Sequence, residues 1–254
     1  MKKLAFLPLA ILAITAFSSC SKLSNFLIHT VVNQEDLEGV APADTVNIEK
    51  TMSVDGTFSN IMLVGSYHVT LVQSDSNVNI AFKGRKVYAD NAILKVSGDT
   101  LYVESKEDRF CRGAYVISVP TVKSITSSGA AEIFTENFQQ TENLSINSSG
   151  AAEIDFKSSS FGDLDIIVSG AATVNLKSVL MHNSMISTAG AGDVSLERIT
   201  ADTIKAELSG ASELKASGNC KDFICNLNGA GDINIDKLNV ANKNAKKLDN
   251  AVNK

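Results

Sequence analysis

A glycine-alanine motif that recurs about every twenty residues constrains the fold of this chain more than any other feature. Six copies lie between residues 128 and 233, and each has Ser, Ala or Asn before the glycine and an aliphatic residue shortly after it. The steps between successive glycines are 21, 20, 20, 20 and 19 residues, a regularity that does not arise by chance. The repeated glycines are Gly129, Gly150, Gly170, Gly190, Gly210 and Gly229.

Each repeat has the pattern of two short strands joined at a bend. In the second copy, Ile146 stands between polar residues before Gly150, and Ile154 and Phe156 alternate with polar residues after it. Alternation with a period of two is typical of half-buried strands, whereas an amphipathic helix would need apolar residues three and four positions apart. A polar stretch follows, and we expect its one apolar residue, Phe161, to point inward.

The apolar residues of successive repeats fall into columns when the repeats are stacked. One repeat cannot bury its apolar face alone, but stacked repeats share a continuous core. We therefore expect a parallel β-helix with one coil per repeat, whose glycine corner needs either a positive φ or close backbone approach. The expected columns are Ile133, Ile154, Val174, Val194, Leu214 and Ile233; Phe156, Leu176, Leu196, Ala216 and Ile235; and Ile146, Ile166, Ile186, Ala206 and Cys225.

The repeats divide the chain into five segments. Upstream of them the periodicity is lost although strand-like alternation continues, and the C-terminal end is rich in lysine and asparagine. A stack of strands needs atypical ends to cover its open edges. The expected segments are a signal peptide (1–19), a lipidated cysteine with a tether (20–44), irregular N-terminal β coils (45–120), regular repeats (121–236) and a C-terminal cap or tail (237–254).

The first residues have the features of a bacterial lipoprotein signal. Lys2 and Lys3 precede a mostly apolar stretch at 4–17, which suits a signal peptide but is too short to span a membrane comfortably. Small residues then lead directly to Cys20, as in a lipobox, where the thiol receives a diacylglycerol. An ordinary secretory signal beside a cysteine is the alternative. Several acyl chains on Cys20 would anchor the protein stably.

Two further observations bear on the compartment. Ser21-Lys22-Leu23 contains no acidic run of the kind that marks some lipoproteins for the outer face, so we expect an outer-membrane anchor on the periplasmic side. Exported compartments permit disulfides, but the three remaining cysteines cannot all pair within one chain. We expect buried free thiols at Cys111, Cys220 and Cys225 rather than a disulfide.

Two stretches resemble a known family. Residues 54–65 with Tyr67 to Gln73 are similar to the opening of the head GIN domain, and Val116 to Pro120 with the serial repeats match its second half. The resemblance covers about residues 50 to 236. It implies a right-handed parallel β-helix in exported proteins of Gram-negative bacteria, often lipoproteins. The family is labelled a "putative auto-transporter adhesin" and has no established catalytic residues, so none is assigned here.

The charge distribution disfavours enzymes and nucleic-acid partners. Residues 128–236 hold 15 Asp and Glu against 6 Lys and Arg, a net charge of about −9 that repels uronates and phosphates. A polysaccharide lyase needs cations for an acidic sugar, yet only one of the four arginines, Arg198, lies in the repeats. A glycosidase needs two carboxylates, one with a raised pKa, and none can be singled out. We therefore expect no enzyme and no catalytic residue.

No metal or cofactor site is expected either. His29, His68 and His182 are far apart in sequence and have no ligand spacing with the cysteines. The chain has no nucleophile elbow and no phosphate loop. Gly190-Ala191-Gly192-Asp193 and its counterpart at 229–232 resemble calcium-binding nonapeptides only faintly, because their period is about twenty.

An acidic column is the one candidate for a binding surface. The residue before each member of the first apolar column faces outward by strand alternation, and stacked carboxylates would lie about 4.8 Å apart. Neighbours repel by roughly 0.8 kcal/mol in water, which a solvated face tolerates. A soluble acidic face and a shallow cation-mediated or hydroxyl-rich ligand surface are both consistent with this pattern. The column is Glu132, Glu153, Thr173, Asp193, Glu213 and Asp232.

These observations favour a cell-envelope lipoprotein that presents a non-catalytic, adhesin-like module to a glycan or an envelope protein. A structural or accessory periplasmic lipoprotein without a dedicated ligand is the second hypothesis, and a polysaccharide-active enzyme is a remote third. The sequence specifies neither the ligand nor the oligomeric state.

Overall fold

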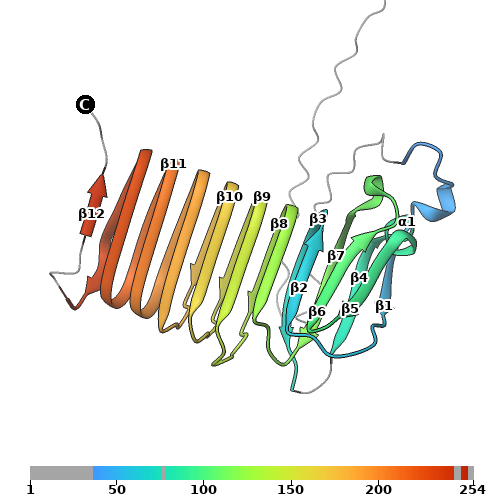
Figure 1. Cartoon of the computed structure of the whole chain (residues 1–254), viewed down its shortest axis with the longest axis horizontal. Coiled ribbons are helices and arrows are strands. Elements are labelled where there is room, and N and C mark those ends of the chain that lie inside the picture. Colours follow the sequence, from blue (N-terminus) through green and yellow to red (C-terminus); the bar gives the residue numbers. More distant parts are fainter. Residues whose placement is uncertain (1–36, 76–77, 243–246, 251–254) are drawn as a thin grey trace, which may run out of the picture.

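The computed structural model describes residues 37–75, 78–242 and 247–250 of the chain. The expected signal peptide and Cys20 lie outside the described residues, as does most of the expected tether. The strands form an elongated row in which the repeats follow one another along the long axis, with the N-terminal strands gathered at one end (Figure 1).

Short strands and one helix make up the N-terminal region, which we define as residues 47–119. Its elements are β1 (Asn47–Met52), β2 (Asn60–Val64), β3 (Ser66–Gln73), β4 (Asn79–Arg85), α1 (Lys86–Asn91), β5 (Ala92–Ser97), β6 (Thr100–Ser105), η3 (Asp108–Phe110) and β7 (Arg112–Val119). A 3-10 turn, η2 (Pro42–Asp44), precedes them.

Long strands make up the repeat region, residues 124–240. They are β8 (Ser124–Glu136), β9 (Leu144–Lys157), β10 (Leu164–Lys177) and β11 (Asn183–Val240), and β12 (Lys247–Asn250) follows. β11 is an uninterrupted run of 58 residues that contains the last three repeats. β12 pairs in parallel with Ile224 to Leu227 of β11.

The prediction of a right-handed parallel β-helix is wrong, although the fold is all-β. In the described part of the chain, twelve strands form one mixed sheet in the order β1-β4-β7-β3-β8-β9-β10-β11-β12, with β2, β5 and β6 beside this path. The pairs β1–β4, β4–β7 and β5–β6 are antiparallel. β5 and β6 form a hairpin whose turn places Gly98 at φ +60°. A tight turn of this kind reverses the chain and makes the two strands it joins antiparallel, whereas the repeated corner does not.

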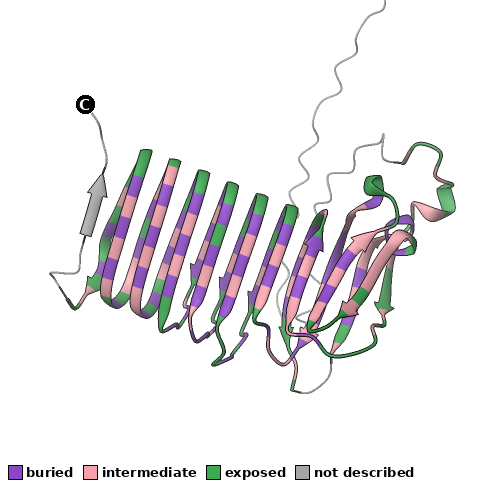
Figure 2. Ribbon diagram, viewed as in Figure 1, coloured by how far each residue is buried: buried purple, intermediate pink, exposed green. Residues whose placement is uncertain are grey.

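The strands of the repeat region are parallel, and equivalent residues of successive repeats lie opposite one another. Gly150 lies opposite both Gly129 and Gly170, and Gly170 lies opposite Gly190. The predicted apolar columns all face inward and are buried, apart from Ile233, which is partly buried near the end of the row. Phe161 is also buried, as predicted. Buried and accessible residues alternate as bands that continue from one strand to the next (Figure 2).

The glycine column is explained by two constraints acting together. Gly170 has φ +127°, a backbone conformation that residues other than glycine rarely adopt. A Cβ atom at this position would also lie 2.1 Å from the carbonyl oxygen of Gly150. The same close contact recurs from Gly129 to Gly229. The column also extends upstream, because a Cβ on Gly129 would lie 2.5 Å from the carbonyl oxygen of Gly65.

A second corner, which the sequence did not reveal, ends the second strand of each repeat. The residue at this corner has a positive φ although it is usually not glycine. The Ser158 amide donates to the Lys177 carbonyl of the next repeat at 2.9 Å and the Ser178 amide to the Glu197 carbonyl at 2.8 Å, whereas the Arg198 amide donates to the Ser217 hydroxyl at 3.0 Å. The corner residues are Asn137, Ser158, Ser178, Arg198 and Gly218.

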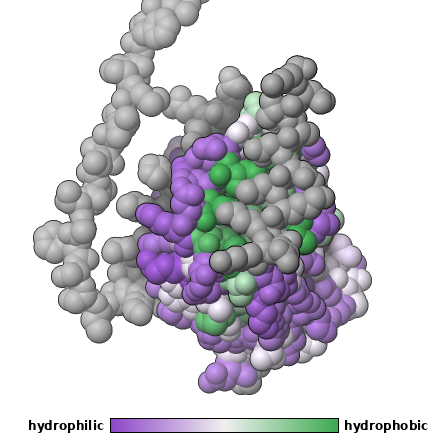
Figure 3. Space-filling model, turned by 90° about the vertical axis from the view of Figure 1, so that its left-hand side faces the viewer, coloured by the Kyte–Doolittle hydropathy of each residue, from purple (hydrophilic) through white to green (hydrophobic). Residues whose placement is uncertain are grey.

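β2 and β3 connect the N-terminal region to the repeats. β2 pairs in parallel with the first half of β8, and β3 pairs with its second half, so that Gly65 stacks against Gly129. At the same junction, buried Gln140 accepts a hydrogen bond from the Val122 amide at 3.0 Å and donates to the Val122 carbonyl at 2.8 Å. At the opposite end, where β11 finishes, hydrophobic side chains are visible inside a hydrophilic rim (Figure 3).

Candidate functional site

The strand register brings four members of the acidic column side by side. Glu132 lies opposite Glu153, Glu153 opposite Thr173, and Thr173 opposite Asp193. The three carboxylate residues are exposed and Thr173 is partly exposed, which agrees with the outward orientation expected from strand alternation. The pairing with Thr173 breaks the line of carboxylates, as the sequence indicates.

A groove runs beside this column, along the glycine corners. It has a volume of about 390 Å³ and crosses five consecutive repeats, from Ala130 to Ala211. Its floor consists of small, buried residues that follow each glycine, and its rim carries Glu132, Glu153, Thr173 and Asp193. The floor residues are Ala131, Ala152, Ala172 and Gly192. We call this feature the acidic groove; the small residues make it concave and the column gives it negative charge.

A histidine from the N-terminal region lies at the first end of the acidic groove. His68 on β3 stands opposite Glu132, and its Nδ1 lies 2.7 Å from Glu132 Oε2. The His68 ring stacks on Phe134 with centroids 4.7 Å apart. Sequence reasoning missed this pair because the two residues are 64 positions apart and lie in regions with no common motif.

A lysine pairs with the fifth member of the column, Glu213. Lys215 Nζ lies 2.6 Å from Glu213 Oε1, and the hydrogen bond to Glu213 raises the Lys215 pKa, with Asp193 and Asp232 adding to the effect. The sequence did contain this signal, since residues two apart on a strand share a face. Glu213 was expected to lie in an uninterrupted line of carboxylates, but Lys215 offsets that charge.

The middle of the groove differs from its ends in its ion pairs. Among the described residues, neither Glu153 nor Asp193 has an ion-pair partner. The described residues also contain no group of three or more His, Cys, Asp or Glu side chains that could hold a metal ion. The carboxylates lie in a line rather than converging, so the groove suits an extended, positively charged contact better than a tightly coordinated cation.

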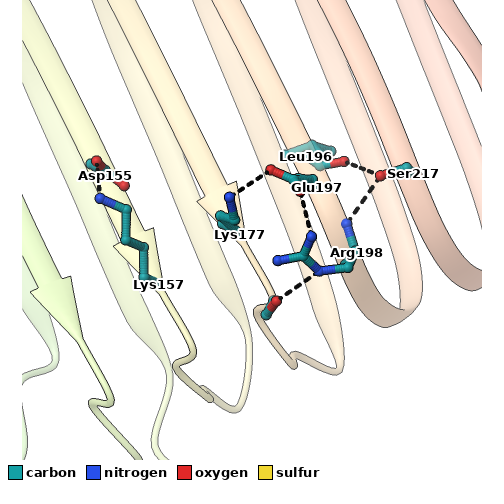
Figure 4. Close-up of polar contacts among 8 residues, drawn as sticks. Asp155, Lys157, Lys177, Leu196, Glu197, Arg198 and Ser217 are labelled. Carbon is teal, nitrogen blue, oxygen red and sulfur yellow. Dashed lines mark hydrogen bonds and ion pairs between the residues drawn. The ribbon is translucent and has the colours of Figure 1, made fainter.

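Ion pairs cover the outward face farther along the same strands. Asp155 contacts Lys157 at 2.9 Å, and Lys177 reaches across to Glu197 on the next repeat at 3.2 Å (Figure 4). Glu197 also contacts Arg198 at the second corner. These pairs balance part of the charge on the outward face near the second corner.

The remaining predicted residues lie apart from the acidic groove. Cys220 and Cys225 are free and buried, as expected, and Cys111 is free but partly exposed. Burial raises the pKa of both Cys220 and Cys225 to about 11, with Asp222 contributing at Cys220. His182 is exposed and lies 3.4 Å from Asp202 on a different face. No helix among the described residues is long and apolar enough to cross a membrane.

The chain matches a sequence family over most of its length. Residues 57–181 and 165–247 match the family described as "Putative auto-transporter adhesin, head GIN domain". No curated protein matches the chain.

Several solved structures resemble this one. A structure described as "a putative adhesin" from Bacteroides fragilis NCTC 9343 has a TM-score of 0.58 at 20% identity, covering 76% of this chain and 99% of its own. A "putative lipid binding protein" from Parabacteroides distasonis ATCC 8503 has a TM-score of 0.47 at 14% identity, with coverages of 74% and 96%. A "putative adhesin" from Parabacteroides merdae ATCC 43184 has a TM-score of 0.44 at 16% identity, with coverages of 74% and 95%. At these identities the first likeness shows a shared fold and nothing about ligands.

Proposed function

Because this chain belongs to the head GIN domain family, we propose that it is a non-catalytic, adhesin-like binding module of the cell envelope. The observation that carries the proposal is the acidic groove. Stacked repeats place the same position of each repeat in line, so the groove offers an extended surface rather than an enclosed pocket. An extended surface of this kind suits a polymeric partner, and an enzyme would need an enclosed site with convergent groups.

The charge of the groove defines the partner's chemistry. Glu153 and Asp193 face a concave surface floored by small side chains, so a chain segment carrying lysine or arginine can approach closely. Opposite charges across such a surface speed association and select against like-charged partners. We propose that a basic segment of an envelope protein binds here. A neutral glycan bridged by cations would use the same carboxylates and is distinguished by its dependence on calcium.

Binding of the purified full-length protein to isolated Gram-negative envelopes tests this function. Glu153→Gln with Asp193→Asn should weaken binding, and added salt should weaken wild-type binding more than that of the variant, because exposed charges are screened. The matched control is Glu136→Gln with Glu142→Gln, which removes the same charge outside the groove. Equal losses of envelope binding in both double variants would contradict binding at the acidic groove and would indicate a general effect of charge. Binding abolished by a calcium chelator would favour the cation-bridged glycan, whereas no binding at all would favour a structural or accessory role.

We further propose that Cys20 anchors the module to the outer membrane, on the periplasmic side. The lipobox-like step before Cys20 supports the anchor, and the lack of acidic residues directly after it supports the orientation. Cys20→Ala should abolish palmitate labelling and membrane retention. Labelling that persists in this variant would refute the anchor, and cleavage of the protein by protease added to intact cells would refute the periplasmic orientation.

A further inference from the structure

A second groove lies on a different face of the repeats, beyond the second corner. It has a volume of about 610 Å³ and extends from Gln140 to Ala241, across the connections between consecutive repeats. Its rims carry Leu180, Thr200 and Asn219 on one side and His182, Asp202 and Lys221 on the other. We call it the neutral groove.

The charges in this groove balance one another. Lys221 Nζ lies 2.6 Å from Asp202 Oδ1, and His182 Nδ1 lies 3.4 Å from Asp202 Oδ2. The hydrogen bond from Lys221 lowers the pKa of Asp202, and His182 lowers it further. Asp202 and Lys221 therefore compensate each other, in contrast to the uncompensated carboxylates of the acidic groove. Neither a strongly basic nor a strongly acidic ligand has a complementary charge here.

The backbone along the groove is already hydrogen-bonded. The Phe161 amide donates to the Leu180 carbonyl and the Met181 amide to the Thr200 carbonyl, both at 3.0 Å. The His182 and Asp202 amides are bonded between repeats in the same way. A peptide that binds as an added strand needs free backbone groups at a sheet edge, and this floor offers few of them. A ligand in this groove must therefore be recognised mainly by side chains.

The side chains that reach the groove combine short polar groups with one large exposed apolar residue. The floor residues Phe161 and Met181 are only 4% and 6% exposed, whereas Leu180 is 54% exposed. Exposed Thr200 lies beside Leu180 in register, and Asn219 and Asn239 are joined across repeats at 3.2 Å. Hydroxyl and amide groups both donate and accept hydrogen bonds, as sugar hydroxyls do. An acyl chain would instead need an enclosed apolar slot.

We propose that the neutral groove binds an uncharged oligosaccharide lying along the long axis of the molecule. Leu180 contacts the apolar C–H face of one sugar ring, and Thr200, Asn219 and Asn239 bond to ring hydroxyls. Successive sugar units follow successive repeats, because strand spacing and the length of an extended sugar unit are similar. This inference goes beyond the proposed function, since it assigns another ligand class to another face.

Titration calorimetry of the purified full-length protein with neutral hexasaccharides tests the inference. The probes are cellohexaose, maltohexaose and mannohexaose, with an oligogalacturonate as the acidic comparator. At least one neutral probe should bind saturably at concentrations up to roughly 10 mM, and the acidic one should not. Leu180→Ala and Asn219→Ala should each weaken that binding about fivefold or more, through a lost apolar contact and a lost hydrogen bond.

Both substituted side chains are exposed, so unchanged melting temperatures should confirm that the variants are folded. Glu153→Gln with Asp193→Asn is the matched control and should bind the sugar like the wild type. The inference is overturned if no neutral probe binds, or if binding survives both groove substitutions. Loss of sugar binding in the acidic-groove control would also overturn it, because the sugar would then occupy the other face. None of these outcomes depends on binding to envelopes.

Discussion

The two regions of the sheet are stabilised by different kinds of core. The repeat region buries mainly Ile, Val and Leu in columns, each residue stacking on its counterpart one repeat away. The N-terminal region instead packs aromatic rings edge to face, with Tyr115 contacting Tyr67 at 5.7 Å and Phe82 at 5.4 Å. Burial raises the pKa of Tyr67 and Tyr115 well above the usual value, as expected for hydroxyls withdrawn from water.

Strand register is specified differently in the two regions. In the repeats, one corner geometry is used again and again, so each repeat positions the next. In the N-terminal region, strands of both directions meet and no single corner is repeated; the pairings of β7 with β3 and with β4 each include an aromatic contact, whereas β5 and β6 are joined by a turn. A substitution at the repeated corner should therefore disturb neighbours on both sides, whereas a turn substitution should act locally.

Gly170→Val should give the largest loss of stability. The substitution combines the strain of a β-branched side chain at φ +127° with a Cβ only 2.1 Å from the Gly150 carbonyl oxygen. We expect a loss of about 3 kcal/mol or more in the free energy of unfolding, measured by urea denaturation. Gly98→Ala is the control, because Gly98 has φ +60° but nothing within 4 Å of its Cβ position. It should cost about 1–2 kcal/mol from backbone strain alone. Equal losses would show that close packing at the repeated corner contributes nothing.

Gln140→Ala should have the next largest effect, at the junction between the two regions. The substitution leaves the buried amide and carbonyl of Val122 without the hydrogen bonds that Gln140 provides. Unsatisfied buried groups cost about 1–3 kcal/mol each, so we expect a combined loss of about 2 kcal/mol, the low end of the sum for the two groups. Gln139→Ala is the neighbouring control: its side-chain hydrogen bonds to Ser158 and Ser160 are exposed, so water can replace them and the stability should change by no more than roughly 0.5 kcal/mol. If both variants melt alike, the junction is not held by the Gln140 side chain.

Much of the repeat region could be predicted from the sequence. The glycine corners, the three apolar columns and the inward position of Phe161 all follow from alternation and spacing, and the structure confirms them. The continuation of the glycine column to Gly65 was also within reach, since Ile61 and Leu63 precede Gly65 and Val69 and Leu71 follow it, as in a repeat. These features depend on residues that are close together in the sequence, so they can be recognised in one sequence alone.

Other features depend on contacts that no local pattern records. The second corner accepts Asn, Ser and Arg as well as Gly, so a positive φ there has no residue signature. The pairing of β1 with β4 and of β4 with β7 is antiparallel and arises from three-dimensional packing. The parallel arrangement predicted from the repeats does not hold outside them. The acidic column was placed correctly on the outward face. The contact between His68 and Glu132 joins two separate regions of the chain and could not be foreseen.

Cysteine reactivity should separate the two regions without altering either. Cys111 lies in the N-terminal region and is partly exposed, whereas Cys220 and Cys225 are buried in the repeats with pKa values raised to about 11. At about pH 8 the buried thiols are protonated and inaccessible, so a disulfide reagent should modify Cys111 at least tenfold faster. In denaturant all three should react alike. The measurement uses the Cys20→Ala chain, which leaves only these three thiols, so fast native labelling that persists in Cys111→Ser would show that the end of the repeat region opens readily.

The smallest expected effect concerns the pH dependence of the exposed Asp202 pair. Lys221 first and His182 second hold the pKa of Asp202 below its ordinary value in the folded chain. The ionised carboxylate thus stabilises the fold at pH values above the unfolded pKa of about 3.9, and this contribution is lost as the pH falls through the lower folded pKa. Asp202→Asn should therefore melt at a slightly lower temperature than the wild type near neutral pH, and the two curves should converge in acid. Because the pair is exposed, about 1 M salt should reduce the difference in melting temperature.

Lys221→Gln is the control variant for this prediction. In a chain that already carries Lys221→Gln, Asp202→Asn should change the melting temperature less. A difference that persists unchanged in acid, in salt and without Lys221 would mean that Asp202 acts through packing or its backbone rather than through charge.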